Sequence, residues 1–254
     1  MGAVWWMCKM RATLDHMRSM PRNDPRQYDE LADQWWRPGG DFEMLHWLAA
    51  ARAALIPPAG RSGAVLVDAG CGGGLLAPHL AGKGYQHVGV DLRQHGLRVA
   101  AAHGVRPVNG DVTALPIATG AADVVAAGEI LEHVTDLPST VAELARVLRP
   151  GGLLVLDTVN DNALSRFVTV TAGEWLGFAP PRLHDPSLFV RPRRLITEFA
   201  RHGVRLEVRG ARPTLTGLFR WRVLRRERTR GRIVPSGLTT VLYQGTGRKE
   251  GEPS

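Results

Sequence analysis

Cysteine is scarce in this sequence, and so are lysine and long hydrophobic runs. The two cysteines, Cys8 and Cys71, are too few for a disulfide framework, which favours a reducing, cytoplasmic location. No stretch approaches the roughly 20 consecutive apolar residues that a membrane-spanning helix needs. The first charge, Lys9, follows the apolar start of the chain, whereas a secretory signal places its charges first. We therefore expect neither a secreted disulfide scaffold nor an integral membrane protein.

The charge is strongly positive, with a net value of +8 and a pI near 10.4. Arginine supplies nearly all of it, and the densest run lies at 220–232. We favour a solvated basic face as the explanation of this run, with an acidic membrane surface and RNA as the alternatives. We therefore expect no specific nucleic-acid binding.

From residue 64 onward, short apolar runs alternate with helical patterns, which indicates βαβ units. We predict an α/β fold with a mainly parallel seven-stranded sheet, helices on both faces and an insert after strand 5. The predicted organisation is an N-terminal extension (1–40), one domain (41–245) with an insert or cap (159–194), and a disordered tail (246–254). The predicted strands are 64–69, 87–91, 106–109, 123–127, 153–158, 205–209 and 239–243, and the main predicted helices are 42–55, 74–81, 97–103 and 141–148.

The most informative segment is the glycine-rich loop that follows the first strand. A dinucleotide loop requires G-x-G-x-x-G, but its third glycine position falls on Leu75. An acid followed by G-x-G-x-G fits instead, on Asp68, Gly70, Gly72 and Gly74. This pattern predicts a Rossmann-like class I methyltransferase that binds S-adenosylmethionine.

Carboxylates after the next two strands extend this prediction. Asp91 ends the second strand about 20 residues downstream, where a carboxylate can accept hydrogen bonds from both ribose hydroxyls. Asp111 follows the third strand and can accept a hydrogen bond from the adenine amino group, while Val112 can pack on the ring.

A run of acidic residues and a histidine follows the fourth strand. If this segment is helical, Glu129, Glu132 and His133 share one face and can bind Mg²⁺, Mn²⁺ or Zn²⁺. A metal-free alternative makes His133 the general base, because its ordinary pKa lies near neutrality. Similar stretches occur in methyltransferases without a metal, so the spacing leaves both open. A (D/N)-P-P-(Y/F) motif is missing here, which disfavours methylation of nucleic-acid bases.

Several segments together resemble the ubiquinone-biosynthesis O-methyltransferases of the 3-demethylubiquinol type. The similarity covers roughly residues 25–220. It lies in the N-terminal signature (28–36 and 40–46), the glycine loop (70–76), the acidic segment (129–133), the segment after strand 5 (158–162) and an H-D-x-x-x-F-V-R-P element (184–192). Alanines 49 and 50 replace the Asn-Pro of the family, and the arginine-rich region after Gly217 departs from its usual ending.

The resemblance implies that Arg52, Gly70, Asp91 and Gly128 contact S-adenosylmethionine. It also implies that Glu129, Glu132 and His133 bind a divalent cation, and that residues 163–181 meet a lipid surface at the inner face of the membrane. We therefore expect an O-methyltransferase that acts on a phenolic or quinol hydroxyl of a small, prenylated molecule. A natural-product methyltransferase acting on another O, N or C centre and a non-catalytic S-adenosylmethionine-binding protein are the alternatives.

Overall fold

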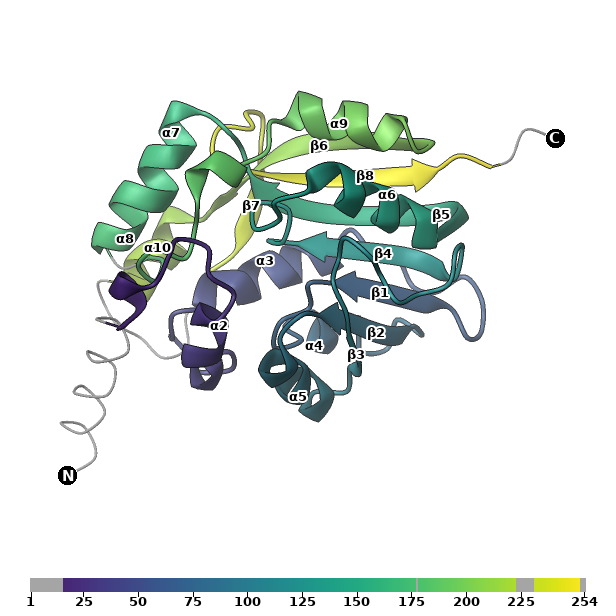
Figure 1. Ribbon diagram of the computed structural model, residues 1–254, viewed down its shortest axis with the longest axis horizontal. Coiled ribbons are helices and arrows are strands. Elements are labelled where there is room, and N and C mark those ends of the chain that lie inside the picture. The colour runs from purple at the N-terminus through teal and green to yellow at the C-terminus, as the bar shows by residue number, and fades with distance from the viewer. Residues whose placement is uncertain (1–15, 177, 223–230, 252–254) are drawn as a thin grey trace.

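The computed structural model describes residues 16–176, 178–222 and 231–251, which form one twisted sheet between two layers of helices (Figure 1). The strands are β1 (Val65–Ala69), β2 (Gln86–Asp91), β3 (Arg106–Asn109), β4 (Ala122–Gly128), β5 (Leu148–Val159), β6 (Val204–Pro213), β7 (Ile233–Ser236) and β8 (Leu242–Lys249). Their order in the sheet is β3-β2-β1-β4-β5-β8-β6-β7. The first five are mutually parallel, and β8 lies antiparallel between β5 and β6.

The predicted α/β architecture is confirmed, with one strand more than the seven expected. The additional strand, β7, pairs antiparallel with the end of β6 at the sheet edge. It begins just after the arginine-rich run at 220–232, most of which lies outside the described residues. Its four residues, Ile-Val-Pro-Ser, are too few to show an alternating pattern in the sequence.

Helices cover both faces of the sheet (Figure 1). Helices α3 and α4 pack against one face, and α6 and α9 pack against the other. The helices are α2 (Gln27–Glu30), η1 (Ala32–Gln34), α3 (Glu43–Ala53), α4 (Ala77–Leu80), α5 (Gln94–Ala102), α6 (Leu137–Val147), α7 (Ala163–Arg166), the π-helical η2 (Phe167–Ala172), α8 (Gly173–Leu176), η3 (Pro186–Leu188), α9 (Pro192–Ala200) and α10 (Leu215–Arg222).

The core is built on strands that are buried on both faces. In β5, every residue from Gly152 to Val159 is buried, as expected for a central strand of a parallel sheet. Leu144 of α6 and Phe199 of α9 are fully buried in the same core cluster, and each side chain contributes about 1.5–3 kcal/mol by its removal from water. The Asp136 carboxylate caps α6 by accepting a hydrogen bond from the Ser139 amide.

Several predicted element boundaries were wrong, as two cases show. The helix expected at 74–81 is confined to α4, because the glycine loop continues as turns through Leu76. The last strand was expected at 239–243 and followed by a disordered tail from 246, but β8 continues to Lys249. Its second half carries glycine instead of apolar residues because the space is small: a Cβ at Gly245 would lie 2.9 Å from the Leu206 side chain.

The N-terminal residues 16–46 and the insert after β5 close over the carboxyl end of the sheet. Asn23 and Arg182 join the two segments, since the Asn23 amide donates to the Arg182 carbonyl at 3.0 Å. Within the described part of the chain, no helix has the length and apolar character needed to cross a membrane.

Candidate functional site

A cavity of about 660 Å³ opens at the carboxyl ends of β1, β2 and β4. In open parallel sheets this edge is where ligands bind, because the loops there diverge at the reversal of strand order. The strand order reverses between β1 and β4. Most residues predicted to bind S-adenosylmethionine line this cavity: Arg52, Asp68, Gly70, Gly72, Asp91, Asp111, Val112 and Gly128.

The glycine loop has a backbone conformation that residues with a Cβ adopt only with strain. Gly70, Gly72 and Gly74 all have left-handed φ values, of 71°, 50° and 76°. Space is short as well, since a Cβ at Gly72 would lie 2.4 Å from the Trp35 ring. Gly74 does not line the cavity; it packs against Ala100 of α5 instead. The first two glycines therefore shape the cavity, and the third allows close packing of α5.

The carboxylate of Asp91 is positioned by two backbone amides. Its Oδ2 accepts a hydrogen bond from Gly72 N and its Oδ1 accepts one from Arg93 N, each at 2.8 Å. Burial raises the pKa of Asp91, although these amides oppose the shift. Each oxygen keeps a second lone pair for a ligand hydroxyl. The geometry suits the predicted ribose contact.

Asp68 and Asp111 differ sharply in their surroundings. Asp68 is buried at the end of β1, with its Oδ2 at 3.3 Å from Nε2 of His87. Asp111 is exposed, and its Oδ1 accepts hydrogen bonds from the Thr113 amide and hydroxyl. This turn places the buried Val112 side chain in the cavity wall.

Arg52 and Gly128 form one structural unit in the cavity wall. The guanidinium of Arg52 donates to both oxygens of the fully buried Asp157, at 2.8 and 2.9 Å. A Cβ on Gly128 would lie 1.6 Å from the guanidinium carbon, so only glycine fits beside Arg52. This bidentate pair connects α3 to β5 behind the cavity.

The segment after β4 is a series of turns, not a helix, so the predicted common helical face is absent. Glu129 has a left-handed φ of 52°, and the His133 amide donates to the Ile130 carbonyl at 2.9 Å. Glu132 is completely buried and accepts a hydrogen bond from the Thr158 hydroxyl. Burial raises the pKa of Glu132 to about 7, and burial together with the neighbouring Glu132 raises the pKa of Glu129.

His133 lies in the cavity wall with both ring nitrogens engaged. Its Nδ1 is 2.5 Å from Oδ1 of Asn23, and its Nε2 is 3.2 Å from the Tyr28 hydroxyl. The His184 ring stacks on it at a centroid distance of 5.3 Å. Burial, with a smaller contribution from His184, lowers the pKa of His133 to about 3, so the imidazole is neutral near pH 7.

The amino-acid sequence of this chain is similar to that of known proteins. A family profile described as a methyltransferase domain matches residues 67–156. The ubiquinone biosynthesis O-methyltransferase of Cupriavidus pinatubonensis is 38% identical over 194 residues, which cover 72% of this chain and 78% of the relative. That of Idiomarina loihiensis is 34% identical over 198 residues, which cover 72% and 82%. This chain belongs to the ubiquinone biosynthesis O-methyltransferase family.

Solved structures agree on the fold. A methyltransferase from Thermotoga maritima, described as a possible histamine N-methyltransferase, matches with a TM-score of 0.62 at 16% identity, covering 89% of this chain and 97% of that one. A phosphoethanolamine N-methyltransferase from Haemonchus contortus, solved with S-adenosylhomocysteine, matches with a TM-score of 0.57 at 16% identity, covering 90% and 58%. Together with the family, these matches establish an S-adenosylmethionine-dependent methyltransferase of class I fold.

The divalent cation implied by the family does not fit the arrangement of residues found here. Among the described residues, no three His, Cys, Asp or Glu side chains are grouped so that they could hold a metal ion. In this arrangement the two ring nitrogens of His133 face Asn23 and Tyr28, and not the carboxyls of Glu129 and Glu132. The structure therefore does not support the metal prediction.

The half of the cavity beyond the glycine loop is largely apolar and comes from segments far apart in the chain. The N-terminal region, the insert, α10 and the strand ends all contribute. The apolar lining residues are Phe42, Met44, Leu45, Leu48, Val159, Val168, Phe178, Leu183, Leu218, Val241 and Leu242.

Four further residues of this site had no role predicted from the sequence. Tyr28, Trp35 and His184 lay in segments that carried the family resemblance, but no role was assigned to them. Asn23 lay outside every motif. Its only local signal is that asparagine tolerates a left-handed backbone, and Asn23 has a φ of 59°.

Proposed function

We propose that this enzyme transfers the methyl group of S-adenosylmethionine to a phenolic or quinol hydroxyl of a small, prenylated molecule. One observation carries the proposal: a single cavity joins the glycine loop and Asp91 to a long apolar chamber that has His133 and Tyr28 in its wall. A prenyl chain suits the apolar chamber. An aromatic hydroxyl suits the imidazole and phenol groups, which can exchange hydrogen bonds with it.

The chemistry required of the protein is modest. S-adenosylmethionine supplies the methyl group and leaves as S-adenosylhomocysteine, with the electrons of the broken C–S bond on sulfur. His133 accepts the hydroxyl proton at Nε2, where the neutral ring holds a lone pair. A low pKa is adequate for this step, because the proton becomes strongly acidic as the new O–C bond forms. The apolar wall excludes water and keeps the acceptor oriented.

A product assay tests the substrate class. The purified enzyme is incubated with S-adenosylmethionine and a catechol that carries a prenyl chain, and the products are identified by mass spectrometry and NMR. We expect O-methylation, with a lower KM for the prenylated catechol than for catechol itself. A product methylated on nitrogen or carbon would refute the proposal in favour of a different tailoring reaction. The absence of turnover with every phenol, despite bound cofactor, would also refute it.

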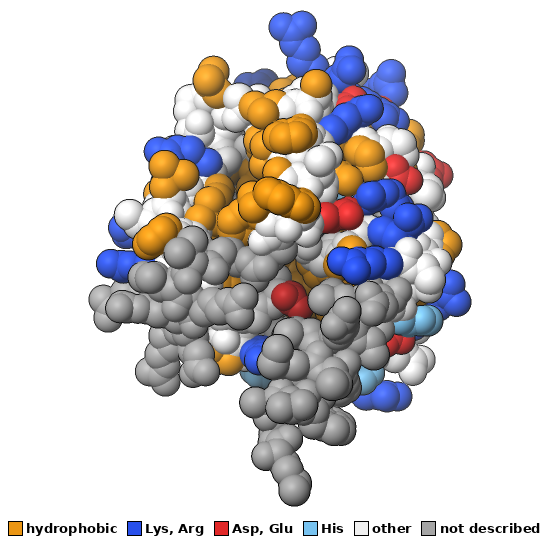
Figure 2. All heavy atoms as spheres, turned by 90° about the vertical axis from the view of Figure 1, so that its left-hand side faces the viewer, with side chains coloured by type: hydrophobic (Ala, Val, Ile, Leu, Met, Phe, Trp, Pro, Cys, Tyr) orange, Lys and Arg blue, Asp and Glu red, His pale blue; other side chains and the backbone are white. Residues whose placement is uncertain are grey.

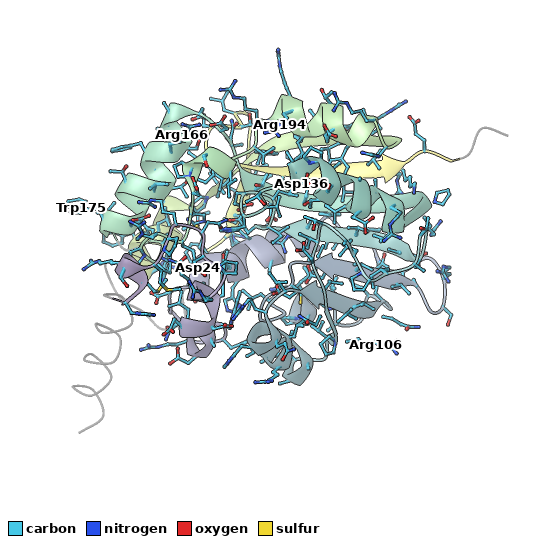
Figure 3. The ribbon with its side chains drawn as sticks, in the orientation of Figure 1. Asp24, Arg106, Asp136, Arg166, Trp175 and Arg194 are labelled. Atoms are coloured by element: carbon cyan, nitrogen blue, oxygen red, sulfur yellow. The ribbon has the colours of Figure 1, made fainter. Side chains whose placement is uncertain are left out.

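The insert presents an outer surface that suits contact with a lipid layer. Exposed apolar side chains gather on it between arginines, as Figure 2 shows. Trp175 is 83% exposed and points away from the body of the molecule (Figure 3), and Phe167 is 58% exposed. On its inner side the same insert contributes Val168 and Phe178 to the cavity. An insert that meets lipid outside and lines the acceptor chamber inside gives a prenylated acceptor a short route from the membrane.

The exposed surface continues onto α10, which packs against the insert. Phe178 and Trp221 have ring centroids 5.9 Å apart, and α10 exposes Leu215 and Phe219. Aromatic and aliphatic side chains flanked by arginine are typical of interfacial membrane contacts.

Vesicle sedimentation measures this contact. We expect binding to phosphatidylglycerol vesicles and a loss of at least roughly tenfold in partitioning for the Phe167→Ser/Trp175→Ser double variant, because each aromatic group buries a large apolar area. Arg106→Ser is the control, since Arg106 lies on the opposite side of the molecule (Figure 3). Equal partitioning of all three proteins would contradict a lipid-binding insert.

A further inference from the structure

The N-terminal segment 20–25, which we call the strap, crosses the cavity wall between the insert and the turns after β4. Residues 20, 22 and 23 of the strap are each hydrogen-bonded to the insert. The Arg182 guanidinium donates to the Met20 carbonyl at 2.7 Å, and Arg22 donates to Glu174 at 2.6 Å. Asn23 has a left-handed φ, and its backbone amide donates to the Arg182 carbonyl.

The Asn23 side chain contacts His133 at two points. Its Nδ2 donates to the His133 carbonyl at 2.9 Å, and its Oδ1 lies 2.5 Å from Nδ1 of the same histidine. These two contacts determine each other. A carbonyl can only accept, so the nitrogen of the amide must face it, and the oxygen must then face the ring.

This orientation fixes the position of the imidazole proton. Because Asn23 Oδ1 can only accept a hydrogen bond, Nδ1 of His133 must carry hydrogen. In a neutral imidazole the other nitrogen then holds the lone pair. That nitrogen, Nε2, faces the Tyr28 hydroxyl at 3.2 Å, and both side chains line the cavity.

We propose that Asn23 is a positioning residue, which holds His133 as the Nδ1–H tautomer and keeps the Nε2 lone pair directed toward Tyr28 at the cavity wall. The inference rests on the proposed function, in which Nε2 takes the acceptor's proton. Without Asn23 the ring can rotate or adopt the Nε2–H tautomer, which presents a hydrogen where a lone pair is needed. A neutral amide orients the ring without adding a negative charge near the buried carboxyls of Glu129 and Glu132.

Two substitutions separate orientation from folding. Asn23→Gly removes both contacts, and glycine accepts the left-handed φ without strain. Asn23→Asp loses the bond to the His133 carbonyl but keeps an oxygen that accepts from Nδ1–H, so it is the conservative variant that should rescue the tautomer. The matched control is Arg26→Ala, in which the exposed Arg26, just beyond the strap, loses its ion pair with Asp24; neither of these two residues lines the cavity.

The decisive measurement is the tautomer of His133, read from the ¹⁵N chemical shifts of its ring in two-bond ¹H–¹⁵N NMR spectra. The spectra are recorded with S-adenosylhomocysteine bound, so no acceptor is needed. We expect Nδ1–H in the native enzyme, in Asn23→Asp and in Arg26→Ala, and a mixture of tautomers in Asn23→Gly. An unchanged Nδ1–H signal in a folded Asn23→Gly protein would overturn the inference, and so would Nε2–H in the native enzyme.

Kinetics provide the second readout and separate this inference from the proposed function. For Asn23→Gly we expect kcat to fall roughly 10- to 100-fold with little change in the KM for S-adenosylmethionine, as is typical when an orienting partner is removed. Asn23→Asp should recover most of kcat. A changed tautomer with unchanged kcat would support the positioning by Asn23 and refute the role of His133 as a base. If Asn23→Gly fails to fold, an Nε2–H signal in Asn23→Asp would still overturn the inference.

Discussion

The two halves of the cavity are built in different ways. Most of the half proposed to bind S-adenosylmethionine, the cofactor half, comes from one continuous region: the loop after β1, the end of β2 and the turn after β3 follow each other within residues 68–112, and only Arg52 and Gly128 are added from elsewhere. The half proposed to bind the methyl acceptor, the acceptor half, comes from the strap, α3, the insert, α10 and the strand ends, which are spread over most of the chain. The cofactor half uses backbone conformation and carboxylates, whereas the acceptor half uses apolar side chains and the hydrogen-bonded ring of His133.

Because of this difference, we expect cofactor binding and methyl transfer to depend on different residues. The backbone of the glycine loop and Asp91 can hold a cofactor whatever the acceptor is. In the proposed function, the acceptor half determines which molecule enters and where its proton goes. We therefore expect substitutions in the acceptor half to change turnover with little effect on cofactor affinity, and substitutions in the cofactor half to do the reverse.

The largest effect is expected in the acceptor half, at His133. His133→Ala removes the proposed base, and general-base catalysis is worth roughly 10²–10⁴ in rate. We expect kcat to fall by this factor, while calorimetric titration shows an unchanged Kd for S-adenosylmethionine. His202→Ala serves as the control, because His202 is exposed on a distant turn. A loss of cofactor affinity in His133→Ala equal to the loss of turnover would show that the two halves do not act separately.

The same contrast explains what the sequence could predict. The sequence could place Gly70, Gly72, Asp91 and Asp111 at the cavity because their spacing reflects local strand–turn–helix geometry, which depends on only a few neighbouring residues. His133 of the acceptor half was predicted, but its contact with Asn23 was not, because the two residues are 110 residues apart and only tertiary structure brings them together. The helical face at 129–133 was wrong because Glu129 adopts a left-handed backbone, a feature that side-chain spacing does not encode.

A smaller effect is expected in the cofactor half, at Asp91. Asp91→Ala removes the acceptor of the Gly72 and Arg93 amides and of the proposed ribose hydroxyls. Hydrogen bonds to a charged group contribute about 1.5–3 kcal/mol, so the Kd for S-adenosylmethionine should rise roughly 10- to 150-fold. At saturating cofactor, kcat should change little. Asp111→Ala should weaken binding less, because Asp111 is exposed and one of its oxygens already holds the turn. An unchanged Kd in a folded Asp91→Ala protein would mean that the ribose lies elsewhere.

The smallest effect is expected from removal of metal ions. If His133 acts as a base whose Nδ1 is held by Asn23, turnover on a catechol does not depend on a cation. Exhaustive treatment with a chelator should then leave kcat within about twofold of the untreated enzyme, which corresponds to a change of less than about 1 kcal/mol in activation free energy. Cofactor affinity should also be unchanged. Calorimetric titration of the chelated enzyme with Mg²⁺, Mn²⁺ or Zn²⁺ should show no saturable binding that depends on Glu132, so the native enzyme and Glu132→Gln should give the same heats.

The opposite result would be equally specific. Glu129 and Glu132 each have one buried carboxylate oxygen with no hydrogen-bond partner among the described residues. Loss of turnover on chelation, recovered by one of these ions and abolished in Glu132→Gln, would mean that the two carboxyls lose their protons and rearrange around a cation. His133 would then have to leave Tyr28 or Asn23 to join them, so its ring ¹⁵N signals should move on addition of metal. Unmoved ring signals together with full activity in chelator would assign the proton transfer in the acceptor half to the imidazole alone.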